Sequence, residues 1–175
     1  MIVGQAGTGK STALTGVARA HQEAGRRVVV TSTGAQAAER LTAEFSEAGL
    51  SDAAGYSIMA LQAAVRRGAV TLGPEVTVIH DEAALASTRE QAWLLQAAAE
   101  SGARIIEVGD PRQSGAVGAG GLWPEIEKAA GERGGWCSSP GSSAPKTRRI
   151  VAIRPNGVPV NTTRPSPVFR AAAAS

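Results

Sequence analysis

The stretch "GQAGTGKS", Gly4 to Ser11, limits the possible folds of this chain more than any other feature. It matches G-x-x-x-x-G-K-S, the pattern of a loop whose backbone N–H groups surround phosphate oxygens. Such a loop joins the end of a buried β-strand to the start of an α-helix, so it predicts an α/β domain with a parallel sheet. Only Met1, Ile2 and Val3 precede the loop, and the expected first strand is therefore short.

The sequence as far as about residue 130 supports this fold class. Runs of β-branched and apolar residues predict strands over 28–31, 76–80 and 104–108. Apolar residues at helical spacing predict helices between them, and a Ser-x-x-Glu capping box opens the last of these at Ser87 and Glu90. Strands that alternate with helices of this length imply right-handed crossovers and a parallel sheet. The glycines expected to end the helices are Gly25, Gly49, Gly68 and Gly102.

The composition changes after residue 130. Residues 131–175 hold six of the nine prolines and keep neither a helical nor a strand period, so they are expected to form a disordered tail behind a domain of residues 1–130. Residues 1–130 carry 11 Lys/Arg and 14 Asp/Glu, a net charge of −3, whereas residues 131–175 carry 7 and 1, a net charge of +6. The basic balance therefore belongs to the tail, for which we hypothesise a frameshift near residues 134–137.

The glycine loop predicts ATP and Mg²⁺ as cofactors. Lys10 is expected to bridge the β- and γ-phosphates, and the Ser11 hydroxyl is expected to coordinate Mg²⁺. The alternative is a chance glycine turn before a helix, which the match at every motif position disfavours. The residues expected to bind the nucleotide are Gly4, Gln5, Ala6, Gly7, Thr8, Gly9, Lys10 and Ser11.

A second element, "VTVIHDEAAL", places two carboxylates at the end of a predicted strand. Open parallel sheets bind ligands at the carboxyl ends of their strands. Asp81 is expected to hold Mg²⁺, and Glu82 to orient and deprotonate an attacking water. A strand that ends in Asp-Glu is usually only a solvated turn, but together with Lys10 it predicts a nucleotide site. We interpret His80 as a packing residue.

A third element indicates a family. The stretch "GDPRQ", which follows the strand "RIIEV", resembles motif III of superfamily 1 helicases, in which the glutamine contacts the γ-phosphate; here that residue is Gln113. "VVVTSTGAQAAERL" resembles motif Ia, which touches single-stranded DNA in that family. "AGYSIMAL" resembles the next motif, but has Ser57 and Met59 where relatives often carry Thr-Ile-His. The resemblance assigns DNA contact to Thr31, Ser32, Thr33 and Gly34.

Taken in order, these motifs resemble the first RecA-like domain of a RecD-type helicase, closest to the helicase part of conjugative relaxases of the TraI/TrwC (MobF) type. The resemblance covers about residues 2–130. It implies a P-loop NTPase fold, a RecA-like three-layer sandwich, and ATP-driven translocation along single-stranded DNA. Helicases of this family also need a second RecA-like domain, so the chain is expected to be truncated at both ends.

Two other functions stay open: a non-functional remnant, and a stand-alone P-loop kinase for small molecules. The Gly-Asp-x-x-Gln motif speaks against the kinase. No apolar run approaches the roughly 18 residues of a membrane span, and a single cysteine gives no disulfide framework. We therefore expect a cytoplasmic protein. Trp123 is expected to pack beneath the loop after Gly109 rather than to stack on a base.

Overall fold

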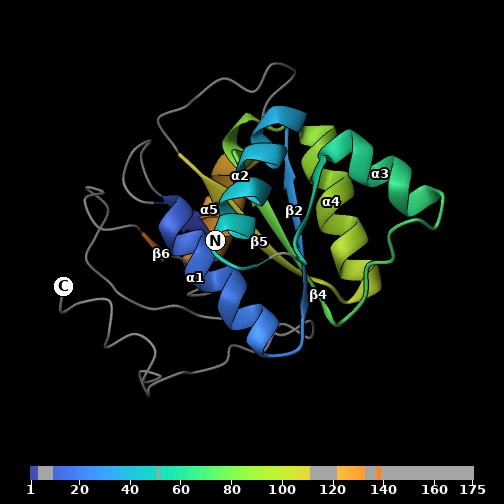
Figure 1. Cartoon of the computed structure of the whole chain (residues 1–175). Coiled ribbons are helices and arrows are strands. Elements are labelled where there is room, and N and C mark those ends of the chain that lie inside the picture. The colour runs from blue at the N-terminus through green and yellow to red at the C-terminus, as the bar shows by residue number, and fades with distance from the viewer. Residues whose placement is uncertain (4–9, 51, 111–121, 133–136, 139–175) are drawn as a thin grey trace.

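The computed structural model describes residues 1–3, 10–50, 52–110, 122–132 and 137–138. Strands and helices alternate along the chain (Figure 1). In chain order the elements are β1 Ile2–Val3, α1 Lys10–Glu23, β2 Arg27–Ser32, α2 Ala35–Glu47, β3 Ala54–Ser57, α3 Ile58–Arg66, β4 Val76–Asp81, the 3₁₀ turn η1 Ala83–Leu85, α4 Thr88–Ser101, β5 Arg104–Gly109, α5 Trp123–Glu132 and β6 Cys137–Ser138.

The sheet has six strands in the order β3-β2-β4-β5-β1-β6, and every neighbouring pair is parallel. Although β1 contains two residues, it lies inside the sheet, where Ile2 is opposite Val108 of β5 on one side and Cys137 of β6 on the other. Strand β5 separates β1 from β4. The predicted parallel α/β fold is therefore confirmed.

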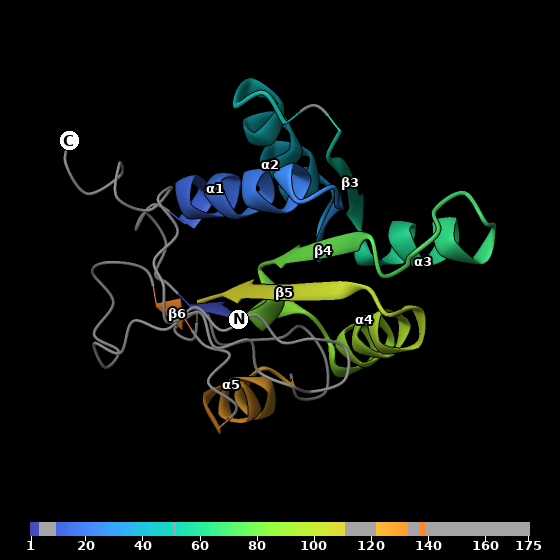
Figure 2. The ribbon, with the colours of Figure 1, turned by 90° about the horizontal axis from the view of Figure 1, so that it is seen from below.

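Helices cover both faces of the sheet, which explains why its strands are apolar on both sides. Val28 and Val30 pack with residues of α1 and α2, such as Leu14 and Phe45. The intervening Val29 packs on the opposite face in a cluster that includes residues of α3 and α4. Seen along the sheet, α1 and α2 lie on one side and α4 and α5 on the other (Figure 2). The domain is a three-layer sandwich.

The helix boundaries predicted from the sequence are confirmed. The helices α1, α2, α3 and α4 each stop before a glycine with positive φ, as expected for a residue without a Cβ at this position. Both hydrogen bonds of the capping box between Ser87 and Glu90 are present. The four glycines are Gly25, Gly49, Gly68 and Gly102, with φ of 75°, 81°, 69° and 74°.

Four elements were not predicted, namely β3, η1, α5 and β6. Strand β3 has the sequence Ala-Gly-Tyr-Ser, which lacks the apolar alternation that predicts a strand. It lies at the edge of the sheet and is only partly buried. The boundary expected at residue 130 falls inside α5, and residues 137–138 pair with β1. The rest of the expected tail, 133–136 and 139–175, lies outside the described residues.

Within the described ranges, none of the helices combines the length and apolar character that a membrane crossing requires.

Candidate functional site

Two of the expected site residues, Asp81 and Glu82, lie where the carboxyl ends of the strands meet. Strands β4, β5 and β1 are parallel and follow one another in this order across the sheet. Their last residues, Asp81, Gly109 and Val3, therefore all lie at this edge. Helix α1 starts at Lys10, and Ser11 is exposed in its first turn. Residues 4–9 of the predicted phosphate loop lie outside the described residues.

Glu82 has an unusual backbone conformation. Its φ of 57° and ψ of 31° are left-handed, and no other non-glycine residue in the described ranges has a positive φ. The Glu82 N–H donates to Oδ1 of Asp81 at 2.9 Å, so the two neighbouring residues orient each other. A left-handed residue with a Cβ costs roughly 1–2 kcal/mol, and such strain concentrates at functional sites. The conformation supports Glu82 as a site residue.

The Glu82 carboxylate is directed toward β2 and α2. Ser32 Oγ donates to Oε2 of Glu82 at 3.4 Å. Oε1 lies 3.8 Å from Nη2 of Arg40, which projects from α2. No motif in the sequence pointed to Arg40, since an exposed arginine on a helix face is commonplace.

A buried amide holds the turn that follows Glu82. Gln91 of α4 is fully buried, and its Nε2 donates to the carbonyl of Ala83 at 2.9 Å. Its Oε1 accepts from the N–H of Leu122, just before α5, at 3.1 Å. Gln91 therefore links the Glu82 turn to Leu122, the residue that precedes α5. Sequence reasoning missed this residue; its only signal is a polar side chain on the apolar face of a helix.

His80 is buried as predicted, but it has a polar partner. His80 Nδ1 lies 2.7 Å from Oε2 of Glu107, its register partner on β5. The side chains are 0% and 4% exposed, so the hydrogen bond is shielded from water. His80 Nε2 and Glu107 Oε1 have no hydrogen-bond partner. Along β4, His80 immediately precedes Asp81.

The indole of Trp123 packs against the end of β5, the strand that precedes the predicted motif III. Trp123 of α5 is 5% exposed and packs with the alanines of the Glu82 turn, which confirms its packing role. Asp110 is also buried. Gln113 lies outside the described residues, so its assignment stays a prediction.

The four residues expected to touch DNA differ in exposure. Thr31 and Ser32 are fully buried, and the Ser32 hydroxyl is directed to Glu82. Thr33 is half-buried and Gly34 is exposed at the start of α2. Of these four residues, only Thr33 and Gly34 are therefore accessible at the surface.

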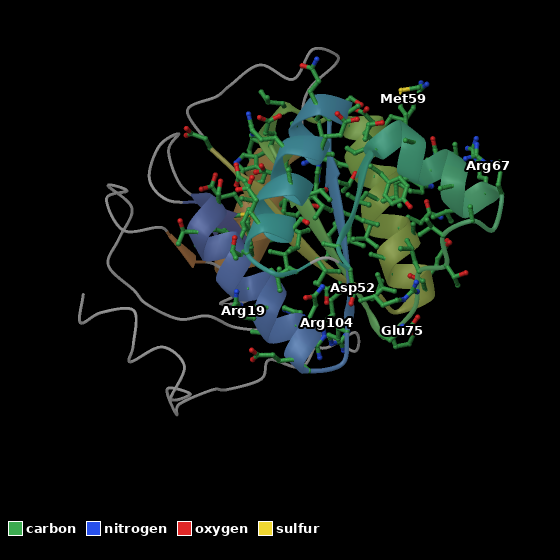
Figure 3. The ribbon with its side chains drawn as sticks, viewed as in Figure 1. Arg19, Asp52, Met59, Arg67, Glu75 and Arg104 are labelled. Atoms are coloured by element: carbon green, nitrogen blue, oxygen red, sulfur yellow. The ribbon has the colours of Figure 1, made fainter. Side chains whose placement is uncertain are left out.

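The next motif lies at the start of α3. Ser57 Oγ accepts the N–H of Ala60 at 3.2 Å and so caps the helix. Met59 is 72% exposed and points outward (Figure 3).

Mg²⁺ fits the oxygen donors at this edge. Mg²⁺ prefers hard oxygen ligands and is often held by one or two protein groups together with substrate phosphates. The Ser11 hydroxyl and the partly buried Asp81 carboxylate supply such donors. Among the described side chains, no three His, Cys, Asp or Glu residues gather as a metal cluster. A metal that depends on nucleotide phosphates needs no such cluster.

Comparison with known proteins matches residues 1–134 to a family described as an AAA domain. The chain is 31% identical over 130 residues to the probable conjugal transfer protein TraA of Sinorhizobium fredii (strain NBRC 101917 / NGR234), covering 74% of the chain. The conjugal transfer proteins TraA of Rhizobium radiobacter and Agrobacterium fabrum (strain C58 / ATCC 33970) are 31% and 30% identical, over 74% and 71% of the chain. The chain spans 11% of the length of each relative.

Proposed function

The chain belongs to the AAA domain family, and from this we propose that it binds Mg·ATP as part of a DNA helicase of the conjugative relaxase type. The observation that carries the proposal is the strained Glu82, which follows Asp81 at the sheet edge where α1 begins. This placement agrees with a water-orienting carboxylate beside a metal-binding carboxylate.

Each site residue has a distinct proposed role. The loop from Gly4 to Gly9 surrounds the phosphates with backbone N–H groups, and Lys10 neutralises charge on the β- and γ-phosphates. Ser11 and Asp81 hold Mg²⁺, which neutralises charge on the phosphoryl oxygens when bound. Glu82 orients a water and accepts its proton.

The DNA-binding part of the proposal rests on the relatives and on the exposed start of α2. The relatives are named as conjugal transfer proteins. We place single-stranded DNA along Thr33 and Gly34, with Gln113 linking the γ-phosphate to this surface. ATP-driven movement along the strand is proposed for a protein of the relatives' full length, of which the chain spans 11%.

Calorimetric titration with ATP tests the nucleotide site. Binding is expected to be stronger with Mg²⁺ than without it, and to be lost in Lys10→Ala. Lys128→Ala is the matched control, because it removes the same charge from an exposed position on α5. Equal ATP binding by Lys10→Ala and Lys128→Ala would refute the assignment of the loop.

Asp81→Asn tests the proposed Mg²⁺ ligand separately from nucleotide binding. This substitution is expected to remove the gain in affinity that Mg²⁺ confers, while metal-free ATP still binds. Glu82→Gln should bind Mg·ATP like the wild type, since its proposed role is in hydrolysis. If Asp81→Asn keeps the full Mg²⁺ effect, Asp81 is not the metal ligand.

A further inference from the structure

Three polar side chains lie side by side on neighbouring strands inside the sheet. Parallel pairing places Thr31 of β2 opposite His80 of β4, and His80 opposite Glu107 of β5. Side chains alternate along a strand, so residues two positions apart share a face. The residues two positions before each of the three belong to or pack against the apolar cluster that includes residues of α3 and α4. Thr31, His80 and Glu107 therefore form one polar row on that apolar face.

This polar row is buried and only partly hydrogen-bonded. His80 Nδ1 lies 2.7 Å from Glu107 Oε2. Among the described residues, no hydrogen-bond partner is found for Thr31 Oγ1, His80 Nε2 or Glu107 Oε1. Nearly all buried polar atoms in folded proteins have a protein or water partner, because an unpaired atom loses its hydration without compensation. Two of these three atoms, Thr31 Oγ1 and His80 Nε2, belong to residues that are directly opposite each other.

The orientation of the His80 ring brings its second nitrogen toward Thr31. The hydrogen-bonding directions of the two nitrogens of an imidazole diverge widely. Because Nδ1 is engaged with Glu107 on β5, Nε2 faces away from β5, and the neighbour on the other side of β4 is β2. Adjacent strands are about 4.8 Å apart. A single small molecule between β2 and β4 can therefore bond both Nε2 and the Thr31 hydroxyl.

The hydrogen-bonding capacity of these two atoms matches a water molecule. An ionised carboxylate only accepts hydrogen bonds, so Nδ1 carries the proton that faces Glu107, and Nε2 of the neutral ring is an acceptor. The Thr31 hydroxyl both donates and accepts. Water can donate to Nε2 and bond the hydroxyl in either sense. A hard metal ion fits less well, because it takes a larger set of oxygen ligands, and the described side chains contain no group of three His, Cys, Asp or Glu residues.

We propose that one internal water molecule binds between Thr31 Oγ1 and His80 Nε2. It joins β2 to the His80–Glu107 pair, so that a continuous chain of hydrogen bonds crosses three strands. The next register pair along β2 and β4 is Ser32 and Asp81, at the edge of the candidate site. The water gives Thr31 a role inside the sheet, whereas the resemblance to helicases assigns it DNA contact. The inference does not depend on nucleotide or DNA binding.

Oxygen-17 relaxation of water, measured over a range of magnetic fields, counts the water molecules that reside long inside a protein. It does not respond to the exchange of hydroxyl protons. Thr31→Val replaces the hydroxyl with a methyl group of similar size, and the full chain is expected to lose one long-lived water. Thr77→Val is the matched control and should keep the count. Thr77 is also fully buried, but on the opposite face, where its hydroxyl lies 2.9 Å from His21 Nδ1.

Nitrogen-15 NMR of the imidazole rings locates the water. The chain has two histidines, so His21→Gln assigns the signals of His80. Thr31→Val is expected to shift the Nε2 signal of His80 and to leave the signals of His21 in place. Thr77→Val should do the opposite. Thr31→Ser keeps a hydroxyl at this position, and should retain both the water and the wild-type Nε2 signal.

The direction of the stability change provides an independent readout. A buried hydroxyl without a partner is unfavourable, so its removal in Thr31→Val would raise the denaturant midpoint. If the hydroxyl shares a water with His80, its removal leaves Nε2 poorly paired, and the midpoint is expected to fall. A raised midpoint would therefore overturn the proposal.

The remaining outcomes also decide the matter. An unchanged water count in Thr31→Val refutes the site. A shifted Nε2 signal with an unchanged count means that the two side chains bond each other directly, and refutes it as well. If Thr31→Val does not fold, the wild type is sufficient. A nuclear Overhauser effect between water and the carbon-bound ring protons of His80 supports the site, and an Nε2 signal typical of an acceptor without a hydrogen bond overturns it.

Discussion

The indole of Trp123 lies so close to the backbone of Gly109 that a Cβ built at Gly109 would stand 2.6 Å from Cη2 of the ring. Two further ring carbons would lie 2.9 Å from that Cβ. The last residue of β5 must therefore be glycine for α5 to pack here. Close packing of this kind tolerates an added methyl group poorly.

Gly109→Ala is expected to destabilise the domain by about 1–3 kcal/mol, because Trp123 must move away from the sheet. Denaturant unfolding measures the change, and the tryptophan emission should shift as the indole becomes wetter. Gly16→Ala is the control: it lies in α1 with open space around its Cα, so the added methyl should stabilise the helix by roughly 0.5–1 kcal/mol. Equal effects of the two substitutions would contradict the close contact.

Replacement of Glu82 should reveal its backbone strain. Glu82→Gly and Glu82→Ala both remove the contacts to Ser32 and Arg40, but only glycine adopts a φ of 57° without steric cost. Glu82→Gly is therefore expected to be more stable than Glu82→Ala by roughly 1 kcal/mol. Chemical denaturation of the two variants provides the comparison, and an equal or lower stability of the glycine variant would argue against a left-handed residue.

The buried pair of His80 and Glu107 should behave as a unit. His80→Leu leaves the Glu107 carboxylate buried without its 2.7 Å partner, and is expected to cost about 3 kcal/mol or more. The double variant His80→Leu/Glu107→Leu removes both polar groups and should be more stable than His80→Leu alone. Unfolding curves of both variants and of the wild type test this; additive losses would mean that the residues do not depend on each other.

Stability is expected to depend on pH through His21. Burial lowers the pKa of His21 below its ordinary value of 6.5, and the charges of Arg104 and Arg26 lower it further. As the pH falls, His21 therefore takes up its proton at a higher pH in the unfolded chain than in the folded chain. The free energy of unfolding should then fall as the pH drops below about 6.5. Above that pH His21 is neutral in both states and contributes no slope.

His21→Gln tests the pH dependence, because glutamine does not titrate and can still reach Thr77, whose Oγ1 lies 2.9 Å from His21 Nδ1. Midpoints of urea unfolding between about pH 5 and pH 7.5 should decline less steeply in the variant than in the wild type. His80, the second histidine of the chain, is present in both proteins and serves as the internal reference. Identical slopes would exclude His21 as the source.

Truncation tests whether strand β6 contributes to the stability of the domain. The sequence predicts that removal of residues 137–175 leaves stability unchanged, but β6 pairs with β1. A chain that ends at Ser138 is expected to be more stable than one that ends at residue 136 by about 1–2 kcal/mol, because the second loses a ladder at β1. Thermal unfolding of both chains decides between the two expectations; equal midpoints would favour the sequence-based one.

Much of the fold was predictable because the relevant signals are local. The strand runs around Val28, Val78 and Ile106, and the glycine after each helix, depend only on neighbours in the chain. The same holds for Asp81 and Glu82, since a strand followed by two carboxylates is visible in the sequence. The short strands β3 and β6 were missed, because their pairing rather than their composition makes them strands.

The sequence by itself determined the α/β class, the order of the elements other than β3, η1, α5 and β6, and the choice of Asp81 and Glu82 as candidate site residues. Only the tertiary structure decided that β5 lies between β1 and β4, that Glu82 is left-handed, and that its carboxylate faces Ser32 and Arg40. The physical reason is that periodicity and turn residues act over a few positions. Contacts between distant segments depend instead on the register in which parallel strands pair after each crossover, and on which helix covers which face.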